Sequence, residues 1–368
     1  MPNEITLRVQ AHALTDFCVR AFQRLDVSEP DARITADVLV TADLRGIFSH
    51  GVGHLRRYAD GLRSGMIVAH PQEQVVTETP ATATIDAGAG LGPPVSYRAM
   101  QKAIQKGLEV GAGFVTVRHS NHYGIAGYYA MMALEHDCIG LAMTNASPVV
   151  MPTFARRPML GTNPIAVAAP AGKERPFVLD MATSTVALGK VEVADRLDKP
   201  IPLGWVVDEN GVPMDDAHLA FEKIRKRGGV GLLPLGGTGE TLGGHKGYGL
   251  ALWVDILCGV LSGAAYSNLI APRTAEGKPH EANVGHFFGA WRLDAFRPAD
   301  EFKAAMDDLQ QRLKNAPKAE GQDRIYIPGE KEYEAMERYL REGIPLDHKV
   351  AADLKAIAQE LDVEYNLE

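Results

Sequence analysis

The feature that most constrains the fold is an alternation of short apolar runs with helical stretches through the middle of the chain, from about Val75 to Asp294. The runs are typical of strands and lie at residues 83–86, 114–117, 139–144, 165–169, 177–179 and 205–207. Helical stretches lie at residues 95–110 and 125–136. This alternation predicts a mixed α/β region with one large sheet.

Both ends of the chain are predicted to be helical. Over residues 13–25, apolar side chains recur every three or four residues, which places them on one helix face. Ser28 then resembles an N-cap with Pro30 in the first turn, and a third helix ends at Gly65. Charged helical stretches follow at residues 299–315, 331–342 and 346–360. We expect these ends to pack together on one side of the sheet, since 368 residues correspond to about two domains.

Charge and cysteine content exclude several classes of protein. The 38 Lys and Arg against 46 Asp and Glu give a net charge of −8, and no basic block stands out, so we expect no nucleic-acid partner. Cys18, Cys138 and Cys258 are odd in number and far apart, which indicates packed thiols in a cytoplasmic protein. The segment Met1 to Gln10 has no basic stretch leading into an apolar run, so no secretory signal is expected.

One segment has the composition of a membrane span. Residues 247–266 are mostly apolar and contain Gly259 and Gly263 in a Gly-x-x-x-Gly pattern. Asp255 lies near the centre, where a charge costs roughly 2.5 to 3.5 kcal/mol or more in a bilayer. We therefore predict a buried helix packed closely through its glycines, and no membrane partner.

Two glycine clusters resemble nucleotide-binding loops without matching them. In the cluster at residues 88–92 the third glycine comes one residue early and two prolines follow, so the Rossmann spacing fails. The cluster at residues 239–246 has the glycines of a phosphate loop, but His245 stands where the lysine is required. What remains is a glycine-rich loop ahead of a helix, whose backbone N–H groups offer a general anion site.

Two histidine pairs have spacings that suit metal ligands, His50 with His54 and His119 with His122. No glutamate is interleaved as in a metalloprotease helix, and the glycines between the first pair weaken a helical geometry, so no metal is expected. A zinc-dependent hydrolase stays the alternative from another class. Ser49 beside His50 suggests a serine hydrolase as a further alternative, but no Gly-x-Ser-x-Gly elbow occurs, so we discount it. Because His50 and His122 fall at junctions between elements, a functional role is favoured for both.

Six motifs occur in a fixed order along nearly the whole chain: Asp43-Leu44-Arg45-Gly46 with Ser49-His50-Gly51-Val52, Ser120-Asn121-His122-Tyr123-Gly124, Leu160-Gly161-Thr162-Asn163-Pro164, Leu179-Asp180-Met181-Ala182-Thr183-Ser184, Gly244-His245-Lys246-Gly247 and Ile327-Pro328-Gly329-Glu330. Together they resemble the malate/L-lactate dehydrogenase family of the non-Rossmann type. That family also includes sulfolactate, ureidoglycolate and diketogulonate enzymes and piperideine-carboxylate reductases.

The resemblance implies an α/β fold in which a non-Rossmann nicotinamide-binding domain with a large mixed sheet is joined by a helical domain formed from the N- and C-terminal segments. We expect residues 1–120 together with 300–368 to form the helical, substrate-binding domain and residues 121–299 the NAD-binding domain. Family members are typically homodimers. The implied reaction is hydride transfer between NAD(P)H and a small 2-keto acid, with malate/oxaloacetate or lactate/pyruvate as the pair. An NADPH-dependent cyclic imine reductase is the alternative within the family.

The resemblance also implies roles for individual residues. His122 and His50 compete for the role of proton donor, with a preference for His122, because an imidazole exchanges a proton near neutral pH. The implied substrate contacts are Ser49, Arg45, His54, Tyr58 and Asn163. The implied coenzyme contacts are Asp180, Met181, Ala182, His245, Lys246, Pro328, Gly329 and Glu330. A carboxylate at the ribose favours NAD, and NADP stays open.

His54 departs from the family pattern. Many relatives carry an arginine four residues after the first histidine as a carboxylate anchor, and an imidazole does not reproduce its fork of donors. The anchor then passes to Arg45, Arg56 or Arg57, or else His54 marks a different substrate.

Overall fold

The central element of the fold is a mixed sheet of seven strands in the order β2-β3-β4-β11-β5-β6-β7. The computed structural model describes residues 5–271 and 280–367, so the first four residues of the Met1 to Gln10 segment lie outside it. The strands are β2 (Gln74–Glu78), β3 (Thr82–Asp86), β4 (Ala112–Ser120), β5 (Cys138–Thr144), β6 (Ile165–Ala169), β7 (Phe177–Met181) and β11 (Val284–Arg292). The predicted fold class, a mixed α/β protein with a large mixed sheet, is confirmed.

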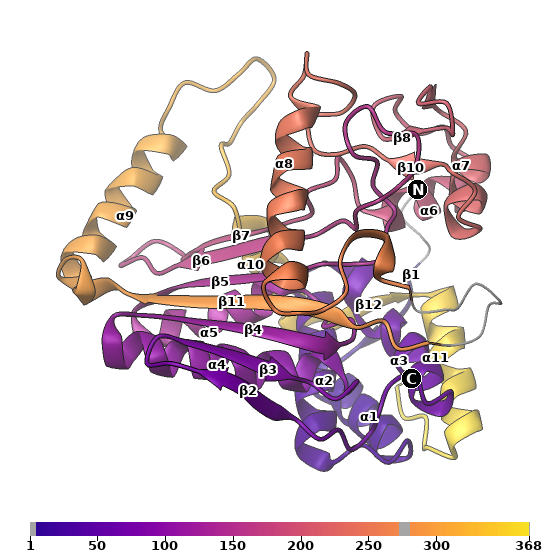
Figure 1. Ribbon diagram of the computed structural model, residues 1–368, viewed down its shortest axis with the longest axis horizontal. Helices are drawn as coiled ribbons and strands as arrows, with labels where there is room; N and C mark the ends of the chain where they lie inside the picture. The colour runs from indigo at the N-terminus through magenta and orange to yellow at the C-terminus, as the bar shows by residue number, and fades with distance from the viewer. Residues whose placement is uncertain (1–4, 272–279, 368) are drawn as a thin grey trace.

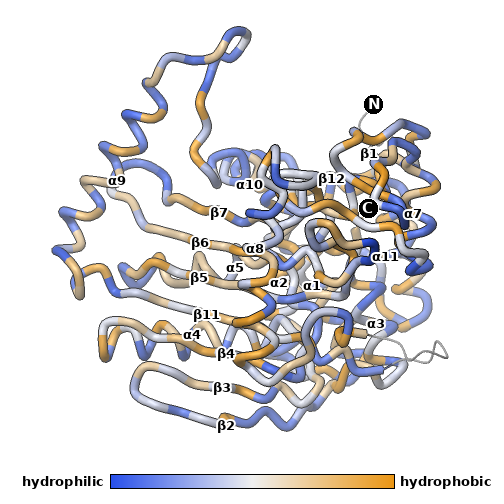
Figure 2. The backbone as a smooth tube through the Cα atoms, turned by 45° about the horizontal axis from the view of Figure 1, so that its top comes forward, coloured by the Kyte–Doolittle hydropathy of each residue, from blue (hydrophilic) through white to orange (hydrophobic). Residues whose placement is uncertain are grey.

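Helices cover both faces of this sheet (Figure 1). On one face lie α4 (Gly92–Val110) and α5 (Ala126–Met132), and on the other lie α8 (Gly244–Asp255) and the π-helical turn η4 (Ile256–Val260). Since both faces are covered, the middle strands are apolar on both sides. In Figure 2, β5 and β6 are mostly white to orange, whereas the loop after α9 (Ala299–Lys314) is largely blue.

The two ends of the chain form one helical layer, as the sequence predicts for all the terminal helices except the one at residues 299–315. That helix, α9, lies outside the layer and binds the segment before β7 through Asp307 and Gln310, so the prediction was wrong for it. The helices of the layer are α1 (Ala11–Gln23), α2 (Glu29–Leu44), α3 (Leu55–Arg63), α10 (Glu330–Glu342) and α11 (His348–Leu361), and their apolar faces share one core. The Ser28 hydroxyl accepts a hydrogen bond from the N–H of Asp31, so the predicted N-cap of α2 is confirmed. Strand β1 (Ile5–Val9) pairs with β12 (Ile344–Asp347), which ties the beginning of the chain to its end.

A smaller unit lies beside α8. It contains a sheet of three short strands in the order β10-β8-β9 and two helices, with bounds β8 (Val206–Val207), β9 (Pro213–Met214), β10 (Gly231–Leu232), α6 (Leu188–Arg196) and α7 (Ala217–Arg225). The remaining short elements are the helical turns η1 (Phe48–His50), η2 (Val52–His54), η3 (Leu134–His136), η5 (Ser267–Leu269) and η6 (Leu293–Ala295).

The segment 247–266 differs in part from its prediction. Close packing through glycine is present, because a Cβ at Gly247 would lie 2.2 Å from the carbonyl oxygen of Leu235 and one at Gly259 2.7 Å from the Cβ of Tyr266. Burial is incomplete, since half of the Trp253 side chain is exposed. The prediction of a buried helix was therefore wrong for one face of α8. Within the described residues no helix is long and apolar enough to cross a membrane.

The strand pairing shows which part of residues 1–120 belongs to the large sheet. Strands β2, β3 and β4, which belong to that range, are hydrogen-bonded into the large sheet with β11. The division into 1–120 with 300–368 and 121–299 stays a prediction, but strand pairing makes β2, β3 and β4 part of the large sheet.

The directions of the strands bring four strand ends to one edge. β3 and β4 are parallel, β11 is antiparallel to both β4 and β5, and β6 is antiparallel to both β5 and β7. The C-terminal ends of β3, β4, β5 and β7 therefore lie at the same edge, which faces the helical layer (Figure 1). Functional side chains gather at this edge.

Candidate active site

Three histidines from two parts of the fold meet at this edge. His50 ends η1 and His54 ends η2 in the helical layer, and His122 follows β4 of the sheet. The ring centroids of His50 and His122 lie 5.6 Å apart, and those of His54 and His122 lie 5.0 Å apart. The two candidate proton donors, though 72 residues apart in the sequence, therefore share one site with the residue that departs from the family pattern.

The side chain of Asp43 holds the turn that carries His50 and His54 in place through a hydrogen bond. The buried Asp43 carboxylate accepts a hydrogen bond of 2.8 Å from the N–H of Val52. A Cβ at Gly51 would lie 1.8 Å from the Asp43 Oδ1 atom, so only glycine allows this close approach. Asp43 was quoted in the sequence motif but not predicted as a site residue, because nothing in the motif shows that its side chain points under the turn.

His122 is held by Tyr58 and by its own loop. The Tyr58 hydroxyl lies 2.7 Å from Nδ1 of His122 and 3.2 Å from the His122 carbonyl oxygen. The N–H of Gly124 donates to the same Nδ1 atom at 3.3 Å. Both groups contact Nδ1, so Nε2 is the nitrogen that they leave free for a proton exchanged with substrate.

His50 is oriented in a similar way. Its Nδ1 atom lies 2.9 Å from the Ser49 hydroxyl, which leaves its Nε2 free of that contact. A Cβ at Gly189, in α6, would lie 3.4 Å from the Cβ of Ser49, so the smaller unit also borders the site. Ser49 and Tyr58, both predicted as substrate contacts, thus touch the two predicted proton donors.

The electrostatic environment keeps the three imidazoles uncharged near neutral pH. Burial and the charge of Arg57 lower the pKa of His50 to about 4. Burial, His50 and Arg57 lower the pKa of His54 to about 3. The pKa of His122 lies well below its usual value, chiefly because of burial and then because of Arg57.

The structure separates the three arginines that were candidates for the carboxylate anchor. Arg56 forms an ion pair of 2.7 Å with Glu360 of α11. Arg45 is buried, with its guanidinium 4.8 Å from the centre of the Tyr333 ring. Arg57 forms no ion pair with a described residue, and its charge acts on all three histidines. Arg57 is therefore the guanidinium that the site leaves available.

A separate pocket collects several predicted coenzyme contacts. Its volume is about 260 Å³, and its lining includes Asp180, Pro328, Gly329 and Arg45 but none of the three histidines. Asp180 accepts a hydrogen bond of 2.7 Å from the N–H of Gly127 at the start of α5. Arg45, predicted as a substrate contact, thus lies with the coenzyme candidates, and its contact with substrate stays a prediction.

The loop of Pro328 and Gly329 is tied to β7. The N–H of Val178 donates to the Pro328 carbonyl at 3.0 Å, and Gly329 has a φ of +97°. A Cβ at Gly329 would lie 3.0 Å from the Cβ of Val178, so a side chain does not fit there. Glu330 is buried and forms ion pairs with Lys314 and Arg324, so its carboxylate is already paired within the protein. Its contact with the coenzyme stays a prediction.

The glycine-rich loop ahead of α8 presents His245 and Lys246. Both side chains are exposed at the first turn of the helix, after Gly243 with a φ of +89°. The loop lies close to the end of β7, because Gly247 packs on Leu235 and the Leu235 N–H donates to the Thr183 carbonyl at 2.8 Å. Met181 and Ala182 directly precede Thr183 and are half-buried.

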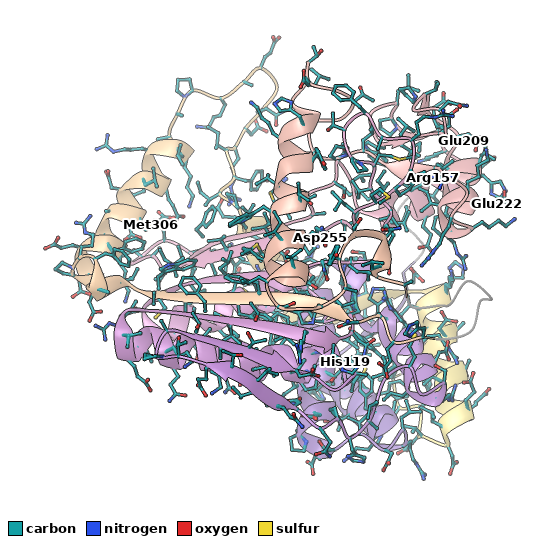
Figure 3. All side chains as sticks on the ribbon, in the orientation of Figure 1. His119, Arg157, Glu209, Glu222, Asp255 and Met306 are labelled. Carbon is teal, nitrogen blue, oxygen red and sulfur yellow. The ribbon has the colours of Figure 1, made fainter. Side chains whose placement is uncertain are left out.

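Two polar residues of the region are engaged inside the protein. The buried Asn163 amide accepts from the N–H of Ala146 at 3.1 Å and donates to the Ala251 carbonyl at 2.9 Å. Its contact with substrate stays a prediction. His119, which is labelled in Figure 3, is not a member of the histidine cluster, and its ring nitrogens contact Asp86 and Glu281.

Sequence reasoning missed His286. This buried residue of β11 lies between the hydroxyls of Thr144 and Ser120, 2.8 and 2.9 Å from its two ring nitrogens. Its ring stacks on Tyr123 with 4.6 Å between centroids. Tyr123 follows His122, so His286 supports the loop that carries the candidate proton donor. The only signal in the sequence was a histidine within an apolar run.

Comparison with known proteins identifies the family. The model of the malate/L-lactate dehydrogenase family matches residues 9–355. The chain belongs to the malate/L-lactate dehydrogenase family. The family assignment confirms the predicted resemblance, makes this protein an oxidoreductase, and removes the zinc-dependent hydrolase as an alternative.

Individual relatives of this dehydrogenase cover nearly its whole length. It is 47% identical over 362 residues to a malate dehydrogenase of Pyrococcus horikoshii, covering 98% of each chain. It is 40% identical over 345 residues to an L-sulfolactate dehydrogenase of Methanocaldococcus jannaschii, covering 93% of this chain and 94% of the relative. The crystal structure of malate dehydrogenase from Entamoeba histolytica superimposes with a TM-score of 0.93 at 34% identity, covering 98% of this chain and 99% of that one.

Proposed function

We propose that this dehydrogenase interconverts malate and oxaloacetate, with NAD as coenzyme and His122 as the group that exchanges the proton. The observation that carries the proposal is the cluster itself, in which a candidate proton donor with an oriented ring lies beside an available guanidinium. The malate dehydrogenase names of the relatives at 47% and 46% identity support malate over lactate.

The residues of the pocket and the glycine loop fit a nicotinamide coenzyme. The N–H groups at the start of α8 and the Lys246 ammonium suit a pyrophosphate. Asp180 uses one carboxylate oxygen for Gly127, so its second oxygen can accept from a ribose hydroxyl. Gly329 and Pro328 line the pocket beside Asp180. When bound, the coenzyme supplies or takes up a hydride at C4 of its nicotinamide ring.

Asp180 is the basis for proposing NAD rather than NADP. A carboxylate at the ribose repels a 2′-phosphate and accepts from a 2′-hydroxyl. Arg45 lines the same pocket, but its guanidinium lies over the Tyr333 ring. We therefore propose that Asp180 decides the preference.

His122 is suited to hold a proton at Nε2 and to give it up or take it back. In oxidation, the uncharged ring keeps its own proton on Nδ1, where it donates to the Tyr58 oxygen, and takes the proton of the hydroxyl group at Nε2. In reduction, the ring with protons on both nitrogens donates from Nε2 to the oxygen of the substrate carbonyl. Tyr58 holds the ring in place during both steps. His50, turned by Ser49, lies against the His122 ring and bounds the space for the substrate.

Arg57 is proposed as the carboxylate anchor that the position of His54 does not supply. A guanidinium offers two parallel donors to a carboxylate, and binding of that anion beside His122 raises the pKa of the ring toward the pH at which it exchanges protons. His54, uncharged, then contributes a single donor or acceptor to the substrate.

We propose a homodimer in a reducing compartment such as the cytoplasm. The exposed apolar face of α8 supports association, because it has the composition of an interface. The three cysteines are free thiols in the structure, which suits a compartment without disulfide formation.

The proposal is tested with the purified protein and a panel of malate, L-lactate and sulfolactate, each with NAD and NADP. We expect the highest kcat/KM with malate and NAD. In Arg57→Gln we expect a rise of about tenfold or more in the KM for malate, whereas Arg33→Gln, at an exposed arginine of α2, leaves KM unchanged. Equal KM values in wild type and Arg57→Gln would rule out Arg57 as the anchor.

A further inference from the structure

The three clustered histidines have a property that hydride transfer does not require. One ring nitrogen from each of His50, His54 and His122 lies within 4.8 Å of one from each of the others. Within the described residues this is the only group of three or more such side chains with that spacing. Proton exchange with a substrate needs one imidazole, so the convergence of three gives the site a capacity beyond that step.

The hydrogen bonds of the three histidines leave one nitrogen of each ring free for a ligand bond. Nδ1 of His50 contacts the Ser49 hydroxyl, and Nδ1 of His122 contacts the Tyr58 hydroxyl. Nε2 of each ring is thereby available. The His54 ring makes no hydrogen bond with a described residue, so either of its nitrogens can turn toward the others.

We propose that His50, His54 and His122 form a binding site for a divalent transition-metal ion, for which Zn²⁺ has the best-suited chemistry, and that the bound ion blocks the active site. Three imidazoles with an open fourth position are a common ligand set for zinc, which accepts neutral nitrogen donors in a tetrahedral arrangement. His54 is the residue that completes the set.

The surrounding groups already provide the partners that metal ligands need. When His122 binds through Nε2, its proton is on Nδ1, which can donate to the Tyr58 oxygen while the Tyr58 hydroxyl donates to the His122 carbonyl 3.2 Å away. Nδ1 of His50 can donate to the Ser49 oxygen in the same way. Such outer hydrogen bonds orient metal-binding histidines.

Two features of the site limit its affinity. Zinc–nitrogen bonds of about 2.0–2.1 Å require donor atoms about 3.4 Å apart, so the rings must close by up to about 1.5 Å. The exposed Arg57 carries a like charge, although solvent screens it. We therefore expect binding weaker than that of a structural zinc site.

Binding at this site would inhibit the enzyme. A metal on Nε2 of His122 occupies the lone pair that exchanges the proton, and the ion takes the space of the substrate. This consequence rests on the proposed function of His122, whereas the metal site itself does not.

The test is direct binding of Zn²⁺ to the tag-free, full-length protein by isothermal titration calorimetry, with Co²⁺ absorption as a report of nitrogen coordination. We expect one ion per chain in wild type. His54→Gln and His50→Gln should each weaken binding by about 100-fold or more, with circular dichroism to show that they fold. The matched control is His136→Gln, at an exposed histidine in η3, which should bind as wild type does.

Each outcome decides the proposal. Absence of Zn²⁺ binding in wild type, or equal binding in wild type, His54→Gln and His50→Gln, would overturn the site. Binding that is lost in these two variants but retained in His136→Gln supports it. If such binding leaves turnover of malate unaffected, the metal site stands and the proposed role of His122 fails.

Discussion

At the scale of single residues, His122 sets the pH dependence of the proposed reaction. Its lowered pKa means that the free enzyme holds the ring uncharged near neutral pH. The uncharged ring is the form that takes a proton from a hydroxy acid, so kcat/KM for malate oxidation should be level between about pH 6 and about pH 8. In the opposite direction kcat/KM should fall about tenfold per pH unit.

Steady-state rates in both directions measure this dependence. His122→Gln is the control, because its residual rate of reduction should no longer decrease as the pH rises. A group of the free enzyme that titrates between about pH 6 and about pH 8 during malate oxidation would contradict the assignment.

Asp43 links the same site to stability. Burial raises the pKa of this carboxyl from 3.8 to about 7, against the opposing effect of the Val52 hydrogen bond. The folded chain therefore binds the Asp43 proton more tightly than the unfolded chain does. The stability that follows is complete below about pH 4 and is lost as the pH rises through about 7.

Asp43→Asn should remove this contribution, because the amide keeps an oxygen for the Val52 N–H and cannot ionise. The difference between the free energies of unfolding of wild type and Asp43→Asn should change with pH. Between about pH 4 and about pH 8, wild type should lose up to about 4 kcal/mol relative to the variant. Urea unfolding at a series of pH values measures it. Asp16→Asn, at an exposed carboxylate of α1, should show no such change; a constant difference for Asp43→Asn would refute the buried, protonated carboxyl.

The family resemblance implied roles for His50, His122 and Tyr58, and the structure brings them into contact. The resemblance could not separate Arg56 from Arg57. Adjacent residues of a helix point in directions about 100° apart, and which one faces the site depends on how α3 packs on α11. Glu360 of α11 binds Arg56 and leaves Arg57 beside the histidines.

At the scale of elements, two strands of the large sheet were not predicted from the sequence, the edge strand β2 and the middle strand β11. β11 joins β4 to β5, yet its sequence shows no alternation because helices cover both of its faces. Gly285 also weakens a strand pattern, and it is required there, since a Cβ would lie 1.7 Å from the Cys258 carbonyl oxygen. Strands with clearer runs, such as β5 and β6, were placed correctly.

The turn from η1 to η2 depends on Gly51 for the same steric reason. Gly51→Ala should force the turn away from Asp43, lower the free energy of unfolding by about 1–3 kcal/mol, and reduce kcat/KM because both His50 and His54 move. Gly53→Ala is the matched control, because a Cβ there would lie 3.5 Å from its nearest neighbour. Thermal unfolding and malate oxidation measure the pair; equal behaviour of the two variants would show that the Asp43 contact does not fix the turn.

At the scale of the whole molecule, the helical ends were predicted to pack together, and one core unites all of them except α9, which binds the segment before β7 instead. Which residues belong to the large sheet was harder to predict. Strands β2, β3 and β4 follow the N-terminal helices in sequence, but β4 pairs with β11, which lies far along the chain. Pairing between such distant strands leaves no local pattern, so the boundary of the helical part could not be read from neighbouring residues.

The exposed face of α8 is a candidate interface between two copies of the chain. Leu250, Trp253, Ile256 and Val260 recur at three or four residues along α8 and η4, and each is exposed by 38% or more. A continuous apolar stripe of this kind is typical of a surface that another protein covers. Asp255 lies within the same helix but points inward, where it binds Asn145 and the N–H of Ser267.

We therefore expect wild type to be a dimer by light scattering at micromolar concentration, and Trp253→Glu to be a monomer, because a charge in the middle of an apolar interface loses its solvation on association. Val110→Glu is the matched control, since Val110 of α4 is exposed to the same degree, 53% against 52% for Trp253, but lies outside the stripe. A dimer that persists in Trp253→Glu would mean that the copies associate through another face. A monomeric wild type would mean that the three histidines, Arg57 and the coenzyme pocket of one chain form the complete active site.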